Sequence, residues 1–255
     1  MKRNGVPANE RHRDHRQLWR DKPVLREVYA DLYRRIVACC KPGLTLEVGG
    51  GSGNFKEYAP DALSLDIVTA PWLDLVADAQ ALPLRPRSVA NIVMLDVFHH
   101  IEFPARFLRE AARVLQPGGL LVMIEPGISP LSWGIYRFMH EEPVNMSADP
   151  LLDGEPDANK DPYFSNQAIP TLLTRTPASR LATVVPDLKI VSVRWLSFAA
   201  YPLSGGFKPW SLLPAAAVSP LLRLEDSLPC WLARLCGFRV QIVLQKAAEQ
   251  LELHA

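Results

Sequence analysis

The chain has 255 residues, 48% of them hydrophobic, which suits a single α/β domain with insertions and a buried core. Its 28 lysines and arginines are balanced by 27 acidic residues, for a net charge of +1. Because binding to a phosphate backbone normally requires a strongly basic face, this balance disfavours RNA and DNA as substrates. The sequence starts without the apolar core of a signal peptide, and no apolar run is long enough to span a membrane, so a cytoplasmic location is expected.

The first region is a locally basic arm, residues 1–22, which contains Arg11, Arg13 and Arg16. Such an arm is expected to be either solvated and frayed or in contact with an anionic surface or partner. Over residues 23–40 apolar residues recur at helical spacing, and the proline at the start suits a first helical turn. An amphipathic helix is therefore predicted there.

The four cysteines have neither a C-x-x-C spacing nor the pattern of a metal-ligand set. They are Cys39, Cys40, Cys230 and Cys236. Adjacent cysteines seldom bridge each other, so all four are expected to be reduced and mostly buried, and no metal site is predicted.

A glycine-rich loop follows the first predicted strand, residues 44–48. The run from Glu47 to Gly53 has the form E-x-G-x-G-x-G. Glycine adopts positive φ readily and lets a ligand approach the backbone closely, and open α/β sheets bind ligands at the carboxyl ends of parallel strands. The spacing is neither that of a dinucleotide-binding loop nor that of a phosphate loop. The loop thus predicts a nucleotide-like cofactor that is not held mainly through phosphate.

Three further segments follow in order. Residues 62–67 are predicted to form a strand with Asp66 near its end, and residues 76–84 contain the pair Asp78-Ala79. Strands are also predicted over residues 72–76, 89–95 and 120–125, with a helix from Pro104 to Leu115 between the last two. Together with the glycine loop, these segments resemble the class I S-adenosylmethionine (SAM) dependent methyltransferases over residues 44–126. The similarity is greatest to the ubiquinone/menaquinone-type domain, methyltransferase type 11.

This resemblance implies a Rossmann-like, doubly wound α/β fold with SAM as the cofactor. The sheet would be seven-stranded and mostly parallel, with an antiparallel closing strand and two insertions that form a cap. Asp66 would accept hydrogen bonds from the ribose, and Asp78 with Ala79 would meet the adenine. Glu47 would either anchor the loop by accepting backbone N–H bonds or approach the methionine amino group, and Asp96 would either hold the methionine end or cap the next turn. The full set of predicted cofactor-binding residues is Glu47, Gly49, Gly51, Gly53, Asp66, Ile67, Asp78, Ala79 and Asp96.

The rest of the chain is assigned around this core. The SAM-binding core with its N-terminal helix is predicted to span residues 23–126, and the proline-rich stretch 127–187 is too long for an ordinary connector and is expected to be a cap or lid. Strands of a closing hairpin are predicted within residues 188–246, separated by an apolar, proline-rich insertion at residues 196–236, and residues 247–255 form a tail. The insertion is expected to pack over the site, to touch a lipid surface or to form a homodimer contact, and the alternative is that it simply packs as part of the core.

Four residues are candidates for acid–base chemistry: His99, His100, His140 and Glu141. An oxygen or nitrogen acceptor needs a base, and histidine or a carboxylate near the strand ends supplies one. The competing interpretation is that the histidine pair orders its loop and that His140 and Glu141 lie on a solvated lid. Tyr136 and Glu142 are further candidates in the same insertion.

The predicted function is methyl transfer from SAM to a small-molecule or lipid- or glycan-linked acceptor, with at most peripheral membrane contact and no nucleic-acid partner. One alternative is a non-catalytic relative that keeps the fold as an interaction module, because fold does not fix function. A nicotinamide-dependent oxidoreductase would share a glycine loop and a strand-end acid. The missing G-x-x-G spacing and the Asp78 segment argue against it.

Overall fold

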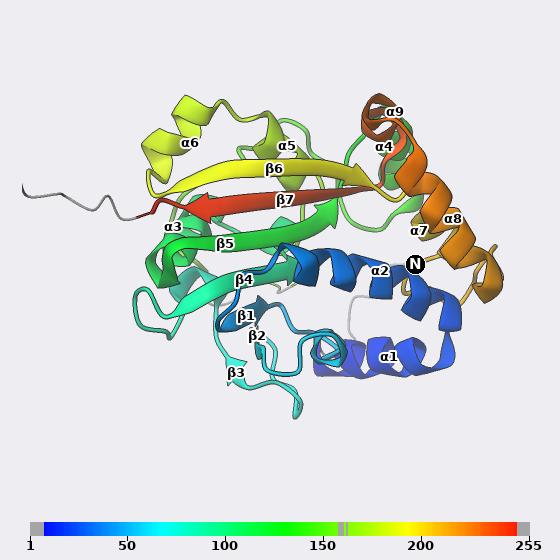
Figure 1. The fold of residues 1–255 in the computed structure, drawn as a ribbon, viewed down its shortest axis with the longest axis horizontal. Coiled ribbons are helices and arrows are strands. Elements are labelled where there is room, and N and C mark those ends of the chain that lie inside the picture. The colour runs from blue at the N-terminus through cyan, green and yellow to red at the C-terminus, as the bar shows by residue number, and fades with distance from the viewer. Residues whose placement is uncertain (1–7, 158–160, 162, 249–255) are drawn as a thin grey trace, which may run out of the picture.

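The computed structural model describes residues 8–157, 161 and 163–248. These form a seven-stranded sheet in the order β3-β2-β1-β4-β5-β7-β6 (Figure 1). All neighbouring strands are parallel except β7, which is antiparallel to β5 and β6. The strands are β1 (Thr45–Val48), β2 (Leu63–Asp66), β3 (Leu75–Val76), β4 (Val89–Leu95), β5 (Leu115–Pro126), β6 (Leu188–Leu196) and β7 (Arg239–Lys246). The predicted fold class is confirmed.

The sheet is covered on both faces, which explains why β4 and β5 are almost continuously apolar. Side chains alternate between the faces along β5. Leu121 and Met123 pack in one buried cluster with Phe107 of α3 (Pro104–Val114). Val122 packs in the other cluster, with Leu32 of α2 (Pro23–Cys39). The predicted helices over residues 23–40 and 104–115 are thus confirmed as the two layers beside the central strands.

The N-terminal arm differs from its prediction. Residues 8–21 form helix α1 (Ala8–Asp21), in which Trp19 is buried against the α2 layer. The next residue, Lys22, donates hydrogen bonds from Nζ to the backbone oxygens of Gly206, Lys208 and Trp210 at 2.7 to 2.9 Å. A frayed arm is therefore wrong for residues 8–21, because a buried tryptophan and these bonds fix it. Residues 1–7 of the predicted arm lie outside the described residues.

The stretch predicted as a cap contains three helices: α4 (Pro130–Met139), α5 (Ile169–Arg175) and α6 (Ala178–Val184). Leu173 of α5 and Leu181 of α6 lie in the same buried cluster as Ile242 of β7. These two helices therefore cover the sheet, and the prediction of a cap remains only for the part of the segment before them.

The second insertion also folds into helices: α7 (Ala200–Ser204), α8 (Ala215–Ser227) and α9 (Cys230–Cys236). Figure 1 shows α4, α7, α8 and α9 gathered at the end of the sheet toward which β5 points. Helices α7 and α8 contact α2, and α4 contacts α9. Within the described ranges, no helix is both long and apolar enough to cross a membrane.

Candidate active site

The glycine loop lies at the carboxyl end of β1, and its conformation requires glycine. Gly49, Gly51 and Gly53 have φ of +77°, +43° and +76°, which L side chains rarely adopt. A Cβ on Gly49 would lie 2.1 Å from Cγ2 of Val97, and one on Gly53 would lie 2.5 Å from Cδ1 of Trp72. At Gly51 a Cβ would meet only the oxygen of Gly49, at 3.8 Å. The loop is packed tightly from both sides and keeps a bare stretch of backbone at Gly51.

Asp66 joins this loop to the end of β2. Its side chain accepts a hydrogen bond from the backbone N–H of Gly51 at 2.9 Å and another from Val68 at 2.9 Å. Asp66 is buried, whereas the next residue, Ile67, is half exposed. The parallel pairing of β1 with β2 brings the predicted acid and the predicted loop together.

Asp78 and Ala79 follow β3 and start the short 3₁₀ helix η2 (Ala79–Ala81). The Asp78 carboxylate caps that helix by accepting a bond from the backbone N–H of Gln80 at 2.8 Å. Ala79 is buried. The predicted adenine-side pair is thus held rigidly, two strands away from the glycine loop.

Glu47 lies beneath the loop and is buried. Its Oε2 accepts a hydrogen bond from Ser64 Oγ at 2.5 Å. The loop amides bond elsewhere, since Gly49 and Gly50 both donate to the Leu65 carbonyl oxygen. The interpretation that Glu47 anchors the loop through its N–H groups is therefore wrong. Burial raises the pKa of Glu47 to about 7, although the Ser64 bond opposes the shift.

Helix α1 covers this region, which the sequence did not predict. The Arg16 guanidinium lies 4.3 Å from the ring centroid of Trp72, and Trp72 Nε1 donates to the Gly51 carbonyl oxygen at 2.8 Å. His12 on the same helix is buried, and its Nδ1 has no hydrogen-bond partner in the structure. Burial lowers the pKa of His12, while the negative charge of Asp66 acts in the opposite direction. An uncharged, unsatisfied ring nitrogen therefore lies close to the acid at the end of β2.

Asp96 follows β4 and takes part in a buried ion pair. It has φ of +60°, and its carboxylate pairs with both Nη atoms of Arg239, the first residue of β7. The Tyr29 hydroxyl also donates to it at 3.1 Å, and the Arg239 guanidinium lies 3.9 Å from the Tyr201 ring centroid. Asp96 does not cap the turn that follows it. That interpretation is wrong because Glu125 accepts the turn's N–H bonds.

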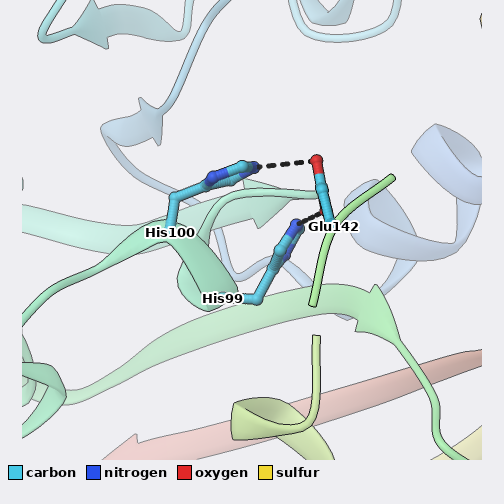
Figure 2. A group of neighbouring side chains, drawn as sticks. All are labelled: His99, His100 and Glu142. Atoms are coloured by element: carbon cyan, nitrogen blue, oxygen red, sulfur yellow. Dashed lines mark ion pairs between the residues drawn. The ribbon is translucent and has the colours of Figure 1, made fainter. Parts of the chain in front are cut away.

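Glu125, at the end of β5, organises the histidine turn η3 (Phe98–His100). Its Oε1 accepts bonds from the backbone N–H groups of Val97 and Phe98 at 2.9 and 2.8 Å, and its Oε2 lies 2.6 Å from Nδ1 of His99. On its other side, His99 Nε2 lies 3.3 Å from Oε2 of Glu142. Figure 2 shows the imidazoles of His99 and His100 converging on the Glu142 carboxylate, which comes from the loop after α4.

The charges of this cluster follow from its burial and pairing. Burial alone would lower the pKa of His99, but the bonds and charges of Glu125 and Glu142 raise it to about 10. Burial and the positive charge of His99 lower the pKa of His100 to about 4. Burial would raise the pKa of Glu142, yet the bond to His99 holds it well below its usual value. His99 is thus a cation between two carboxylates, next to a neutral His100.

The other predicted residues of the cap are placed differently. His140 accepts a bond at Nδ1 from the Gln167 side-chain amide at 2.9 Å, and the same amide donates to Glu142 at 2.8 Å. Glu141 is exposed, and within the described residues no hydrogen bond or ion pair joins it to the histidines. Tyr136 is buried and donates to the Phe238 carbonyl oxygen. The acid that meets the histidine pair is therefore Glu142 rather than Glu141.

Residues 46–123 match the family of methyltransferase domains. The chain carries a methyltransferase domain of this family. A SAM-dependent methyltransferase from Thermotoga maritima has 18% sequence identity and a TM-score of 0.55, with 90% of this chain and 93% of that chain covered. Another from Archaeoglobus fulgidus has 12% identity and a TM-score of 0.48, with 88% and 95% covered. No curated protein matches the sequence.

The Thermotoga structure shows that the methyltransferase fold extends over most of the chain, beyond the residues of the family match. SAM is the cofactor of this family. The methyltransferase domain described here fits that cofactor on its own geometry. The glycine cradle cannot take a Cβ at Gly49 or Gly53, the backbone at Gly51 is open, and His12 presents an unsatisfied nitrogen near Asp66.

Proposed function

We propose that the protein transfers a methyl group from SAM to a small, lipid-linked acceptor that combines an apolar part with a polar group. When bound, SAM supplies an electrophilic methyl group on a positively charged sulfonium. The chain's own task is then to align the acceptor with that methyl group and to exclude water. The observation that carries the acceptor class is an exposed apolar face on α4 and α9. Helix α4 ends next to the cluster of His99, His100, Glu125 and Glu142, called here the polar cluster.

We assign the parts of SAM to residues at the neighbouring carboxyl ends of β1, β2 and β3. Asp66 would accept hydrogen bonds from the ribose hydroxyls, and the half-exposed Ile67 would pack against the adenine. Asp78 and Ala79 would meet the purine edge, and the open backbone at Gly51 would face the cofactor's chain. Glu47, which takes no loop N–H bond, would receive the methionine amino group. An arriving cation at this buried carboxylate would favour its ionised form.

The apolar face consists of Trp133, Phe138 and Met139 on α4 and Trp231 and Leu235 on α9. All five are exposed, Phe138 by 77% and Trp231 by 63%. Isolated exposed apolar side chains are ordinary. Here five lie on two helices in contact, with the Trp133 and Phe138 rings 6.0 Å apart, and we take this group as an interaction surface. The exposed cations Arg137 and Arg234 lie on the same two helices, which suits an anionic lipid surface.

The position of this face supports an amphiphile rather than a lipid surface alone. Helix α4 ends at Met139, and the next residues are His140 and Glu142 of the polar cluster. An acceptor whose tail lies on the apolar face would therefore bring its polar group to the strand ends near Asp96. His99 would order this wall rather than act as a base, because both its ring nitrogens are engaged by carboxylates. Catalytic roles for His100, His140 and Glu141 remain predictions.

Two measurements test the proposal. Calorimetry with SAM and with its demethylated product should show binding of one equivalent, and absence of binding would contradict the cofactor assignment. Incubation with methyl-labelled SAM and a total lipid extract should then place label in the organic phase. Label in aqueous small molecules, RNA or protein would contradict a lipid-linked acceptor, and binding without any turnover would favour the interaction module.

Variants locate the acceptor surface. Phe138→Ser and Trp231→Ser should raise the apparent KM for the lipid acceptor about tenfold each, since each removes a large side chain from an apolar contact. The KM for SAM should not change. Val191→Ser on β6 is the matched control, because Val191 is also an exposed apolar residue, at 47%, but belongs to neither α4 nor α9. Equal effects of all three changes would contradict the assignment of this face.

A further inference from the structure

The histidine turn and the cap loop bring three ligating side chains to one point. His99 and His100 come from η3 and Glu142 from the loop after α4, and Figure 2 shows all three directed at one another. One ligand atom from each lies within 4.8 Å of the other two. His99 Nε2 is 3.3 Å from Glu142 Oε2, and His100 Nε2 is 3.9 Å from Glu142 Oε1.

Both imidazoles have their other ring nitrogen engaged by an acceptor. Nδ1 of His99 lies 2.6 Å from the buried Glu125 carboxylate, and Nδ1 of His100 lies 3.3 Å from the Phe164 carbonyl oxygen. A carbonyl oxygen or an ionised carboxylate can only accept, so each Nδ1 carries the hydrogen of its bond. A metal ion would replace the Nε2 proton of the His99 cation, and each Nε2 would then offer the ion a lone pair. Histidines that ligate metals are oriented by this same kind of bond.

The third ligand is oriented as well. Gln167 is buried, and its side-chain amide donates to Glu142 Oε2 at 2.8 Å. Glu125 is itself fixed by two backbone N–H donors from Val97 and Phe98. All three ligands are thus held by groups behind them, which is the arrangement of a built metal site rather than of a chance encounter of side chains.

We propose that His99, His100 and Glu142 bind a divalent transition-metal ion of the Zn²⁺ type. Two imidazoles and one carboxylate are a donor set that Zn²⁺ accepts in sites that keep an open position. Metal–nitrogen and metal–oxygen distances of about 2.1 Å place ligand atoms about 3.4 Å apart on a tetrahedral ion. The His99–Glu142 separation of 3.3 Å is already close to this value, and the other separations, which are 4.8 Å or less, would shorten when the ion binds.

The open position faces the side from which an acceptor would arrive. The His99 side chain is exposed by 3% and closes the base of the site, whereas those of His100 and Glu142 are exposed by 20% and 31%. A bound ion would hold an oxygen of the acceptor and favour its deprotonated form as a Lewis acid. This extension rests on the proposed function, whereas the metal site itself does not.

The test is a titration of chelator-treated full-length protein with Co²⁺ and Zn²⁺. We expect one equivalent of Co²⁺ to bind, with the intensified visible absorption of a four-coordinate site, and Zn²⁺ to displace it. Glu142→Gln and His100→Ala should each weaken binding at least 100-fold, and Glu125→Gln should weaken it about 10- to 100-fold. Glu141→Gln is the matched control, because it changes the neighbouring, exposed carboxylate and should leave binding unchanged.

Two outcomes overturn the proposal. One is the absence of Co²⁺ binding, which would mean that the ion pairs of protonated His99 with Glu125 and Glu142 bring these side chains together without a metal ion. The other is equal Co²⁺ binding by the wild type and by Glu142→Gln, with circular dichroism to confirm that the variant is folded. Titration of the same metal-free protein with demethylated SAM separates the two proposals. Cofactor binding without Co²⁺ binding overturns only the metal site, and the reverse result overturns only the proposed function.

Discussion

The cofactor side and the polar cluster lie at the same end of the sheet but are built in different ways. The cofactor side consists of the glycine loop, Asp66 and Asp78, and its geometry comes from backbone conformation and from strands adjacent in sequence. The polar cluster consists of His99, His100, Glu125 and Glu142, with the Asp96–Arg239 pair beside it. Its four members come from three separate segments, and the pair beside it joins the end of β4 to the start of β7, so each charged group depends on its partners to offset burial. The first region should respond to changes of backbone freedom, and the second to the loss of single charges.

The largest expected effect is from Arg239→Met. This change leaves the Asp96 carboxylate without its cation in a largely buried site, which typically costs about 3–5 kcal/mol of folding free energy. Urea denaturation should measure the loss. Arg234→Met, on the exposed side of α9, is the control and should stay within about 0.5 kcal/mol of the wild type. If Arg239→Met were as stable as the wild type, the ion pair would not contribute to stability. Adding Asp96→Asn to Arg239→Met should recover part of the loss, because it removes the unpaired charge.

On the cofactor side, Gly49→Ala should destabilise the protein by about 2–5 kcal/mol and abolish tight SAM binding. Positive φ costs an L residue about 1–2 kcal/mol, and a Cβ at 2.1 Å from Val97 adds an overpacking cost of about 1–3 kcal/mol. Thermal unfolding and calorimetry check both effects. Gly134→Ala in α4 meets no atom within 4 Å and should be neutral or slightly stabilising. Similar behaviour of the two variants would refute the steric argument.

Glu47, on the cofactor side, should make the stability of the protein depend on pH. Its folded pKa of about 7 lies above the ordinary value of 4.5, so the folded state holds this proton more tightly. The resulting stability is fully present below pH 4.5 and is lost as the pH rises through 7. As the pH rises from 4.5 to 7, the free energy of unfolding of Glu47→Gln should therefore increase by about 3 kcal/mol relative to that of the wild type. Urea titrations at several pH values across that range measure the gain. In the control Glu141→Gln, the free energy of unfolding should change with pH as it does in the wild type.

The smallest expected effect is from Arg16→Ala in α1. Losing the stack of its guanidinium on Trp72 should cost about 1 kcal/mol, and the demethylated cofactor should bind about fivefold more weakly. Calorimetry measures the change, with Asp14→Ala at an exposed position of the same helix as the control. An unchanged affinity in Arg16→Ala would mean that α1 does not cover the cofactor.

The parts of the site that were predictable share one property. Glu47 and Asp66 each end a parallel strand next to a recognisable loop, so a local pattern places them at the same edge. Glu125 also ends an apolar strand at that edge, and the same rule applied to β5 would have found it. Arg239 begins an antiparallel strand, so it reaches the same edge from the opposite direction, 143 residues from Asp96. No local pattern pairs those two residues.

By itself, the sequence determined the sheet, the two helical layers beside its central strands, the glycine loop and the family of the cofactor. The strands and helices follow from hydrophobic periodicity and the loop from backbone freedom, which are properties of short segments. The order of the sheet and the cofactor follow from the resemblance to class I methyltransferases. Only the tertiary structure decided that α1 covers the loop, that Glu142 rather than Glu141 meets the histidines, and that Glu125 contacts His99 while Arg239 pairs with Asp96. Neighbouring residues in a loop differ little in sequence character, and only packing determines which of them is turned inward to face a buried charge.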